Sequence, residues 1–167
     1  MKYTGCVILW LATDMPLSVR YRFSQRFRVP AQKAFAWCTS FDPQDHTLMG
    51  EKGAERRITL VTIGTLILQD TFPSKAGKVE KQKLVQIYPE KLSWVSTHLS
   101  GPNQYSQFLY QISPRGNSAS ILEFTGLHLD YEGKEDTQSL AKRLREEDSA
   151  AWKLLAKAMA AEVGKKK

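Results

Sequence analysis

Hydrophobic and polar residues alternate most regularly over residues 19–29. Side chains of a strand point to its two faces in turn, so the apolar members share one face: Tyr21, Phe23, Phe27 and Val29. The opposite face carries an arginine row: Arg20, Arg22, Arg26 and Arg28. Further strand-like segments follow at 57–63, 65–72, 78–88, 92–99, 105–113 and 118–131, separated by turn-forming residues. The short connections predict hairpins and an antiparallel meander, with a bulge at Gly126 where the apolar parity changes.

Helical patterns lie on either side of this meander. Pro30 favours a first helix turn, which predicts a helix over 30–39, and Asp42-Pro43 predicts a second short helix before Gly50. From Lys134 to about Val163 the period is helical, with Trp152 at the margin of the apolar face. That face contains Leu140, Leu144, Ala151, Leu155 and Met159.

The composition is that of a soluble globular domain, with 167 residues, 42% hydrophobic and 25% charged. The longest apolar run, 6–12, is too short to span a bilayer. Two cysteines and three histidines form no ligand-spaced motif, which argues against a zinc site or a disulfide framework, and no cofactor motif is present. We therefore expect no metal and no cofactor.

The sequence predicts three parts of the chain. Residues 1–14 have the outline of a short signal peptide without a small-x-small cleavage site, and Met15 stands just before the first strand. Either Met15 is the natural start, or 1–14 is an extension of doubtful structural role. The domain would then span 15–163, followed by a basic tail at 164–167, in a protein of the cytoplasm.

The formal net charge is +7, but the excess is spread along the chain. The arginine row could meet a phosphate backbone or lipid headgroups. The alternative is cross-strand pairing with acids such as Glu123, together with protection of a sheet edge. The sequence favours the second interpretation, and it disfavours a nucleic-acid partner or integral membrane association.

Three local motifs resemble those of the START-like, or SRPBCC, superfamily. Residues 27–37 (FRVPAQKAFAW) are similar to its opening strand and helix entry, 88–94 (YPEKLSW) to a family hairpin, and 151–159 (AWKLLAKAM) to the end of its long helix. Within the superfamily the polyketide cyclase/dehydrase and lipid-transport-like group is the most similar. One departure lies at 45–50 (DHTLMG), where many relatives have a Trp.

The resemblance implies an α+β helix-grip fold. In this fold a curved antiparallel sheet of about seven strands wraps around a long C-terminal helix, and two short helices follow the first strand. It also implies a cavity between sheet and helix that holds a small hydrophobic molecule, lipid-, polyketide- or isoprenoid-like. Together with parity and helix phase, the resemblance implies these lining residues: Trp94, Ser96, His98, Phe108, Tyr110, Leu144, Trp152, Leu155 and Met159.

Three titratable residues are candidates for chemistry in such a cavity. His98 could orient a ligand carbonyl or act as a general base, or it could simply meet solvent or a backbone carbonyl near a strand end. Asp70 could be a cavity acid or lie at a sheet edge. Asp148 interrupts the apolar helix stripe, where a helix cap or a salt bridge is the simpler explanation.

The sequence thus leaves three functions open. The first is a non-enzymatic module that binds a small apolar molecule. The second is a cyclase- or dehydratase-type enzyme that uses His98 with Asp70 or Asp148. The third is a protein-interaction module resembling chaperone-ATPase activators. We favour the first, because the sequence brings no two titratable residues within reach of each other.

Overall fold

A computed structural model describes residues 15–75 and 77–165, so the expectations for 1–14 and for the end of the basic tail lie outside the described residues. Its seven strands form one antiparallel sheet in the order β1-β7-β6-β5-β4-β3-β2. The strands are β1 (Leu17–Phe27), β2 (Glu55–Thr62), β3 (Thr65–Ser74), β4 (Gly77–Tyr88), β5 (Ser93–His98), β6 (Gln107–Pro114) and β7 (Ser120–Asp130). The helices are α1 (Ala31–Cys38), α2 (Gln44–Leu48), the 3-10 turn η1 (Pro89–Lys91) and α3 (Thr137–Lys165).

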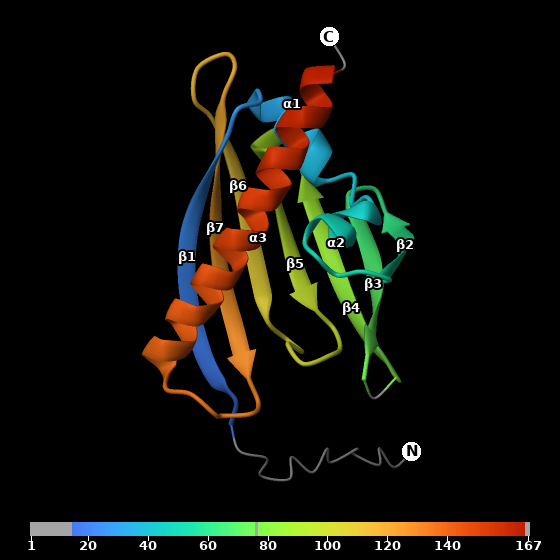
Figure 1. Ribbon diagram of the computed structural model, residues 1–167, viewed down its shortest axis with the longest axis vertical. Helices are drawn as coiled ribbons and strands as arrows, with labels where there is room; N and C mark the ends of the chain where they lie inside the picture. Colours follow the sequence, from blue (N-terminus) through green and yellow to red (C-terminus); the bar gives the residue numbers. More distant parts are fainter. Residues whose placement is uncertain (1–14, 76, 166–167) are drawn as a thin grey trace, which may run out of the picture.

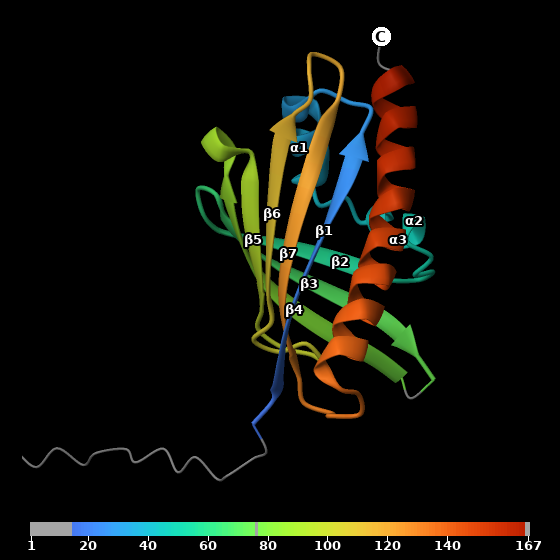
Figure 2. The same cartoon turned by 90° about the vertical axis from the view of Figure 1, so that its left-hand side faces the viewer.

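The arrangement confirms the predicted α+β helix grip. The sheet is strongly curved, and α3 lies on its concave side, where it runs alongside β1 (Figures 1 and 2). The two short helices follow β1 directly, and α2 lies over the far part of the sheet, near β3 (Figure 1). The long helix therefore lies over the β1 side of the concave face, and α2 lies over the β3 side.

The long helix begins and packs as its sequence pattern predicts. The Asp136 carboxylate accepts hydrogen bonds from the backbone N–H groups of Gln138 and Ser139, which satisfies donors that the first turn leaves free. Leu140, Leu155 and Met159 are buried on the face toward the sheet. Their burial in one stripe fixes which side of α3 faces the concave surface.

The bulge predicted at Gly126 does not form. Pairing of β7 with β1 and β6 runs without interruption through this position, opposite Tyr21 and Phe108. The parity stays constant because Gly126 and His128 face inward, whereas Leu127 and Leu129 occupy the outer face. A Cβ atom at Gly126 would lie 2.6 Å from the Tyr21 ring, so glycine is required here for close packing rather than for a bend.

Aromatic rings join α3 to the sheet. The Trp94 and Tyr110 rings stack with centroids 4.7 Å apart, and Trp152 of α3 lies 5.8 Å from Tyr110 and 6.4 Å from Trp94. Phe27 contacts Trp152 from the other side, with the two ring centroids 6.2 Å apart. Trp152 is thus the residue of the helix that docks into the aromatic cluster.

We expect Trp152→Ala to lower the free energy of unfolding by about 3 kcal/mol, because it removes a large ring from between three others. Urea denaturation monitored by circular dichroism measures this loss. Leu154→Ala is the matched control, since Leu154 is half exposed on the same helix and its loss should stay below about 1 kcal/mol. A similar small loss for Trp152→Ala would contradict this account of helix docking.

Candidate functional site

The inner face of the central strands carries polar groups among the aromatic rings. On β5, Trp94, Ser96 and His98 face inward as predicted, with Phe108 of β6 opposite Ser96. His128 of β7 lies on the same face. Within residues 15–75 and 77–165, three buried atoms of this face have no hydrogen-bond partner: Ser96 Oγ, His98 Nδ1 and His128 Nδ1. Buried polar groups without a partner are rare in folded proteins, because burial removes their hydrogen bonds to water and no protein group replaces them.

His98 is buried, contrary to the simpler expectation that it meets solvent. Its ring lies edge-on to Phe108 at 5.1 Å between centroids, and Lys83 of β4 is its cross-strand neighbour. Burial, together with the positive charges of Lys83 and Lys81, lowers the pKa of His98 to about 3. The imidazole is therefore neutral at pH 7, with one nitrogen as donor and the other as acceptor.

Asp148 lies in the middle of α3, so it does not cap a helix start. Its Oδ2 accepts a hydrogen bond of 2.5 Å from the hydroxyl of Tyr21 on β1. Burial raises the pKa of Asp148, and burial beside this carboxylate raises that of Tyr21. The open space above Gly126 lets the Tyr21 ring stand where its hydroxyl reaches the helix.

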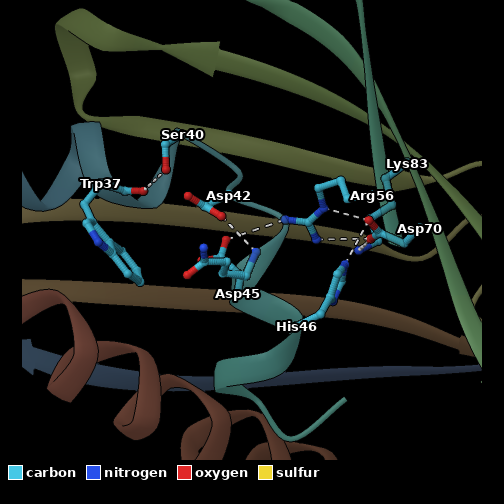
Figure 3. Close-up of polar contacts among 9 residues, drawn as sticks. Trp37, Ser40, Asp42, Asp45, His46, Arg56, Asp70 and Lys83 are labelled. Atoms are coloured by element: carbon cyan, nitrogen blue, oxygen red, sulfur yellow. Dashed lines mark hydrogen bonds and ion pairs between the residues drawn. The ribbon is translucent and has the colours of Figure 1, made fainter. Parts of the chain in front are cut away.

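The third candidate, Asp70, is part of a buried ion network. It is 0% exposed, and it lies on β3, which is not an edge strand because β2 pairs with its outer side. Arg56 of β2 donates to Asp70 from Nε at 2.6 Å and from Nη2 at 3.2 Å, and Lys83 Nζ donates at 2.7 Å (Figure 3). Although burial alone would raise it, contacts with His46, Arg56 and Lys83 hold the pKa of Asp70 well below its usual range.

Helix α2 joins the same network. Nε2 of His46 lies 3.0 Å from Asp70 Oδ1, without the alignment of a hydrogen bond, and its ring packs edge-on against Phe72. Asp45 Oδ2 lies 3.5 Å from Nη1 of Arg56, and burial raises the pKa of Asp45 to about 6 (Figure 3). The network therefore ties α2 to three strands.

Two of the hollows on the surface of the described part of the chain lie near charged side chains. One, of about 450 Å³, lies between α1, α2 and the end of α3 and includes Trp37, Asp45 and Glu162 in its wall. The other, of about 510 Å³, is lined by Arg26, Arg28, Ser118 and Ala119. Neither is lined by the residues predicted to bind a ligand.

The structure brings part of the predicted set together. Trp94, Tyr110 and Trp152 form one aromatic cluster, and Leu144 packs with Phe108 beside it. Met159 and Leu155 are buried under α3. Among the described residues, no hydrogen bond or ion pair joins His98 to either acid of the enzyme hypothesis: Asp70 binds Arg56 and Lys83, whereas Asp148 accepts from Tyr21.

Sequence reasoning missed several residues of these clusters: Tyr21 as a partner of Asp148, and His46, Arg56, Lys83 and His128. A signal existed for Lys83 and Arg56, since both alternate in phase with inward apolar residues such as Val85 and Ile58. His128 was hidden by the assumed bulge, which placed the wrong face of β7 inward.

Comparison with solved structures finds the same architecture elsewhere. The Zhui aromatase/cyclase of Streptomyces sp. R1128 is similar with a TM-score of 0.65 and 9% identity, covering 87% of this chain and 93% of that one. Ara h 8.0201 is similar with a TM-score of 0.64 and 10% identity, covering 87% and 99%. The di-domain ARO/CYC StfQ of the steffimycin pathway gives a TM-score of 0.67 and 13% identity, covering 89% and 52%.

The protein has the helix-grip fold. No protein-family model matches the sequence, and neither does any curated protein. The three-dimensional similarity therefore establishes the fold alone. In the described ranges, no helix is long and apolar enough to cross a membrane, and no group of His, Cys, Asp and Glu is placed to hold a metal ion.

In this helix-grip domain, Asp70→Asn should lower the free energy of unfolding by about 3–5 kcal/mol, because Arg56 and Lys83 keep their charges while losing the carboxylate between them. Urea denaturation measures the loss. Lys78→Gln, which removes a surface ion pair, should cost less than about 1 kcal/mol. The double variant Asp70→Asn/Lys83→Met should recover part of the loss. If Asp70→Asn costs no more than Lys78→Gln, and the double variant is no more stable than Asp70→Asn, the network does not stabilise the fold.

Asp45 should make the free energy of unfolding fall as pH rises, whereas an ordinary ion-paired carboxylate makes it rise. Its folded-state pKa of about 6 exceeds the unfolded value near 4, so between these pH values only the folded state holds the proton. The free energy of unfolding should therefore fall as pH rises through this window, by roughly 2 kcal/mol. Melting temperatures of wild type and Asp45→Asn between pH 4 and about 7 measure the difference, and parallel profiles would refute the assignment.

Proposed function

We propose that the protein binds a small hydrophobic molecule between the inner face of the sheet and α3, and that this molecule carries a hydroxyl or carbonyl group. The observation that carries the proposal is the set of buried polar atoms without partners on that face: Ser96 Oγ, His98 Nδ1 and His128 Nδ1. A lipid-, polyketide- or isoprenoid-like molecule fits this description.

A bound ligand would compensate these buried polar groups. A buried polar group that makes no hydrogen bond costs about 1–3 kcal/mol, and several lie together here. A ligand oxygen placed near His98 and Ser96 would remove part of this cost. Because the His98 imidazole is neutral, it can donate to a carbonyl or accept from a hydroxyl.

The surroundings suit an apolar ligand body. Phe108 and Tyr110 stand next to these polar groups on the sheet, and Leu144 and Trp152 lie opposite on α3. Small-molecule sites commonly combine such apolar walls with a few polar groups that set orientation. Two similar structures are described as aromatase/cyclases, which is consistent with a ligand between sheet and helix.

A second candidate function is an enzyme of the cyclase or dehydratase kind. The observation that favours it is the buried Tyr21–Asp148 hydrogen bond, since a phenol that donates to a buried carboxyl could pass a proton to a bound carbonyl. Loss of product formation in Asp148→Asn, with ligand binding retained, would support the enzyme over the carrier.

The carrier proposal predicts saturable binding of a hydrophobic fluorescent probe to the folded protein with one site per chain. Ser96→Trp should abolish this binding because the larger side chain would occupy the inner-face position opposite Phe108 where the ligand is proposed to lie. Fluorescence titration together with the melting temperature measures both effects. Thr97→Trp adds the same bulk to the outer face of β5 and should bind the probe normally.

Substitution of His98 tests the polar part of the site. His98→Leu should weaken a hydroxyl- or carbonyl-bearing probe by roughly two- to tenfold while leaving a pure hydrocarbon unaffected, because only the former loses a hydrogen bond. If wild type binds no probe and Ser96→Trp unfolds the protein, the inner face is a filled core and the proposal fails.

A further inference from the structure

The arginine row lies on the convex face of the sheet, away from α3. Arg20, Arg22 and Arg26 alternate along β1 with the inward residues, and all three are exposed, as is Arg28 just beyond the strand. β1 is an edge strand of the sheet. Figure 2 shows α3 on the concave face of the sheet, so the helix does not obstruct the convex face. The predicted parity of the row is therefore confirmed.

The acid partners expected for this row are not in place. Among the ion pairs of the described residues, none includes any of the four arginines. Glu123, the expected partner, lies opposite Ser24 between Arg22 and Arg26, and it forms no ion pair with either. Four arginines and one glutamate thus leave this face with a local positive charge that the chain does not neutralise.

The shape and surroundings of the row add two features. The hollow of about 510 Å³ at its end is lined by Arg26, Arg28 and Ser118, which offer guanidinium groups and a hydroxyl to one anion. Two exposed leucines lie on the same face as the arginine row. Leu127 of β7 is 39% exposed and pairs with Arg20. Leu109 of β6 is 45% exposed and pairs with Thr125, which in turn pairs with Arg22.

The neighbouring residues distinguish between kinds of polyanion. Sites for single-stranded nucleic acid combine basic residues with aromatic rings on which bases stack. The outer positions of β1, β7 and β6 carry no aromatic residue, because the rings of these described strands face inward. Arginines beside exposed leucines instead match a surface with phosphate headgroups above an apolar layer.

We propose that the convex face formed by the arginine row, Leu109 and Leu127 docks onto an anionic lipid bilayer. The arginines bind headgroup phosphates, the hollow at Arg26 and Arg28 receives one of them, and the leucines contact the boundary of the acyl region. This docking is independent of the proposed ligand site, since the two lie on opposite faces of the sheet.

The experiment is co-sedimentation of the full chain with vesicles of mixed phosphatidylglycerol and phosphatidylcholine, and with vesicles of phosphatidylcholine alone. Wild type should bind only the anionic vesicles, more weakly as salt increases. We expect a roughly hundredfold or greater loss of affinity for the anionic vesicles in the variant Arg20→Gln/Arg22→Gln/Arg26→Gln/Arg28→Gln. Each arginine near an anionic surface raises the affinity several-fold, and these factors multiply.

A matched control separates position from net charge. Lys142→Gln/Arg145→Gln/Lys153→Gln/Lys157→Gln removes the same charge from exposed positions of α3 and should bind nearly as wild type does. Leu109→Ser/Leu127→Ser should weaken binding several-fold, whereas Leu154→Ser, also exposed and apolar, should not. Melting temperatures confirm that every variant is folded.

Three outcomes would overturn the proposal. Equal losses in the two charge variants would mean non-specific attraction. Equal binding to neutral vesicles would exclude headgroup recognition by the arginines. Binding of an oligonucleotide that depends on the arginine row, without binding of vesicles, would identify nucleic acid as the partner.

Discussion

One buried carboxylate holds together the half of the molecule that α3 does not cover. Asp70 lies between Arg56 of β2 and Lys83 of β4, so its charge is compensated from both neighbouring strands. Through Arg56 and His46 the same group positions α2. Replacing such a network by well-packed apolar residues could give equal stability. What the ions supply is a unique placement for a five-residue helix that is too short to be stable alone.

The sheet separates two chemistries by side-chain parity. Inward positions collect nearly all of the aromatic rings and the unpartnered polar atoms, whereas outward positions of β1 collect arginines. Because neighbours in a strand face opposite ways, residues such as Tyr21 and Arg22 lie side by side in sequence and yet take part in unrelated interactions. An internal ligand site and a surface docking site can therefore change independently.

The parts that could be predicted from sequence are those that depend on local periodicity. Alternation placed Tyr21 and Phe27 inside, and the helical period selected Leu140, Leu155 and Met159 as the buried stripe. The prediction failed at Gly126, where a single glycine was taken for a bulge because the space it leaves is filled by a ring a hundred residues away.

The ion network was invisible for a related reason. His46, Arg56, Asp70 and Lys83 come together only once the register of three strands and the position of α2 are known. Arg56, Asp70 and Lys83 each alternate in phase with apolar residues, but that parity does not show which of these side chains meet. Pairwise contacts of this kind require topology as well as pattern.

The position of β1 has a consequence for synthesis of the chain. β1 is the first strand of the described fold, and its partners are β7 and α3, which are the last two elements of that fold along the chain. A ribosome therefore releases nearly the whole domain before its first strand can pair, and contacts so distant in sequence form slowly. Until then the apolar side of β1 is available to chaperones, or to β1 of another nascent chain, with which it could aggregate.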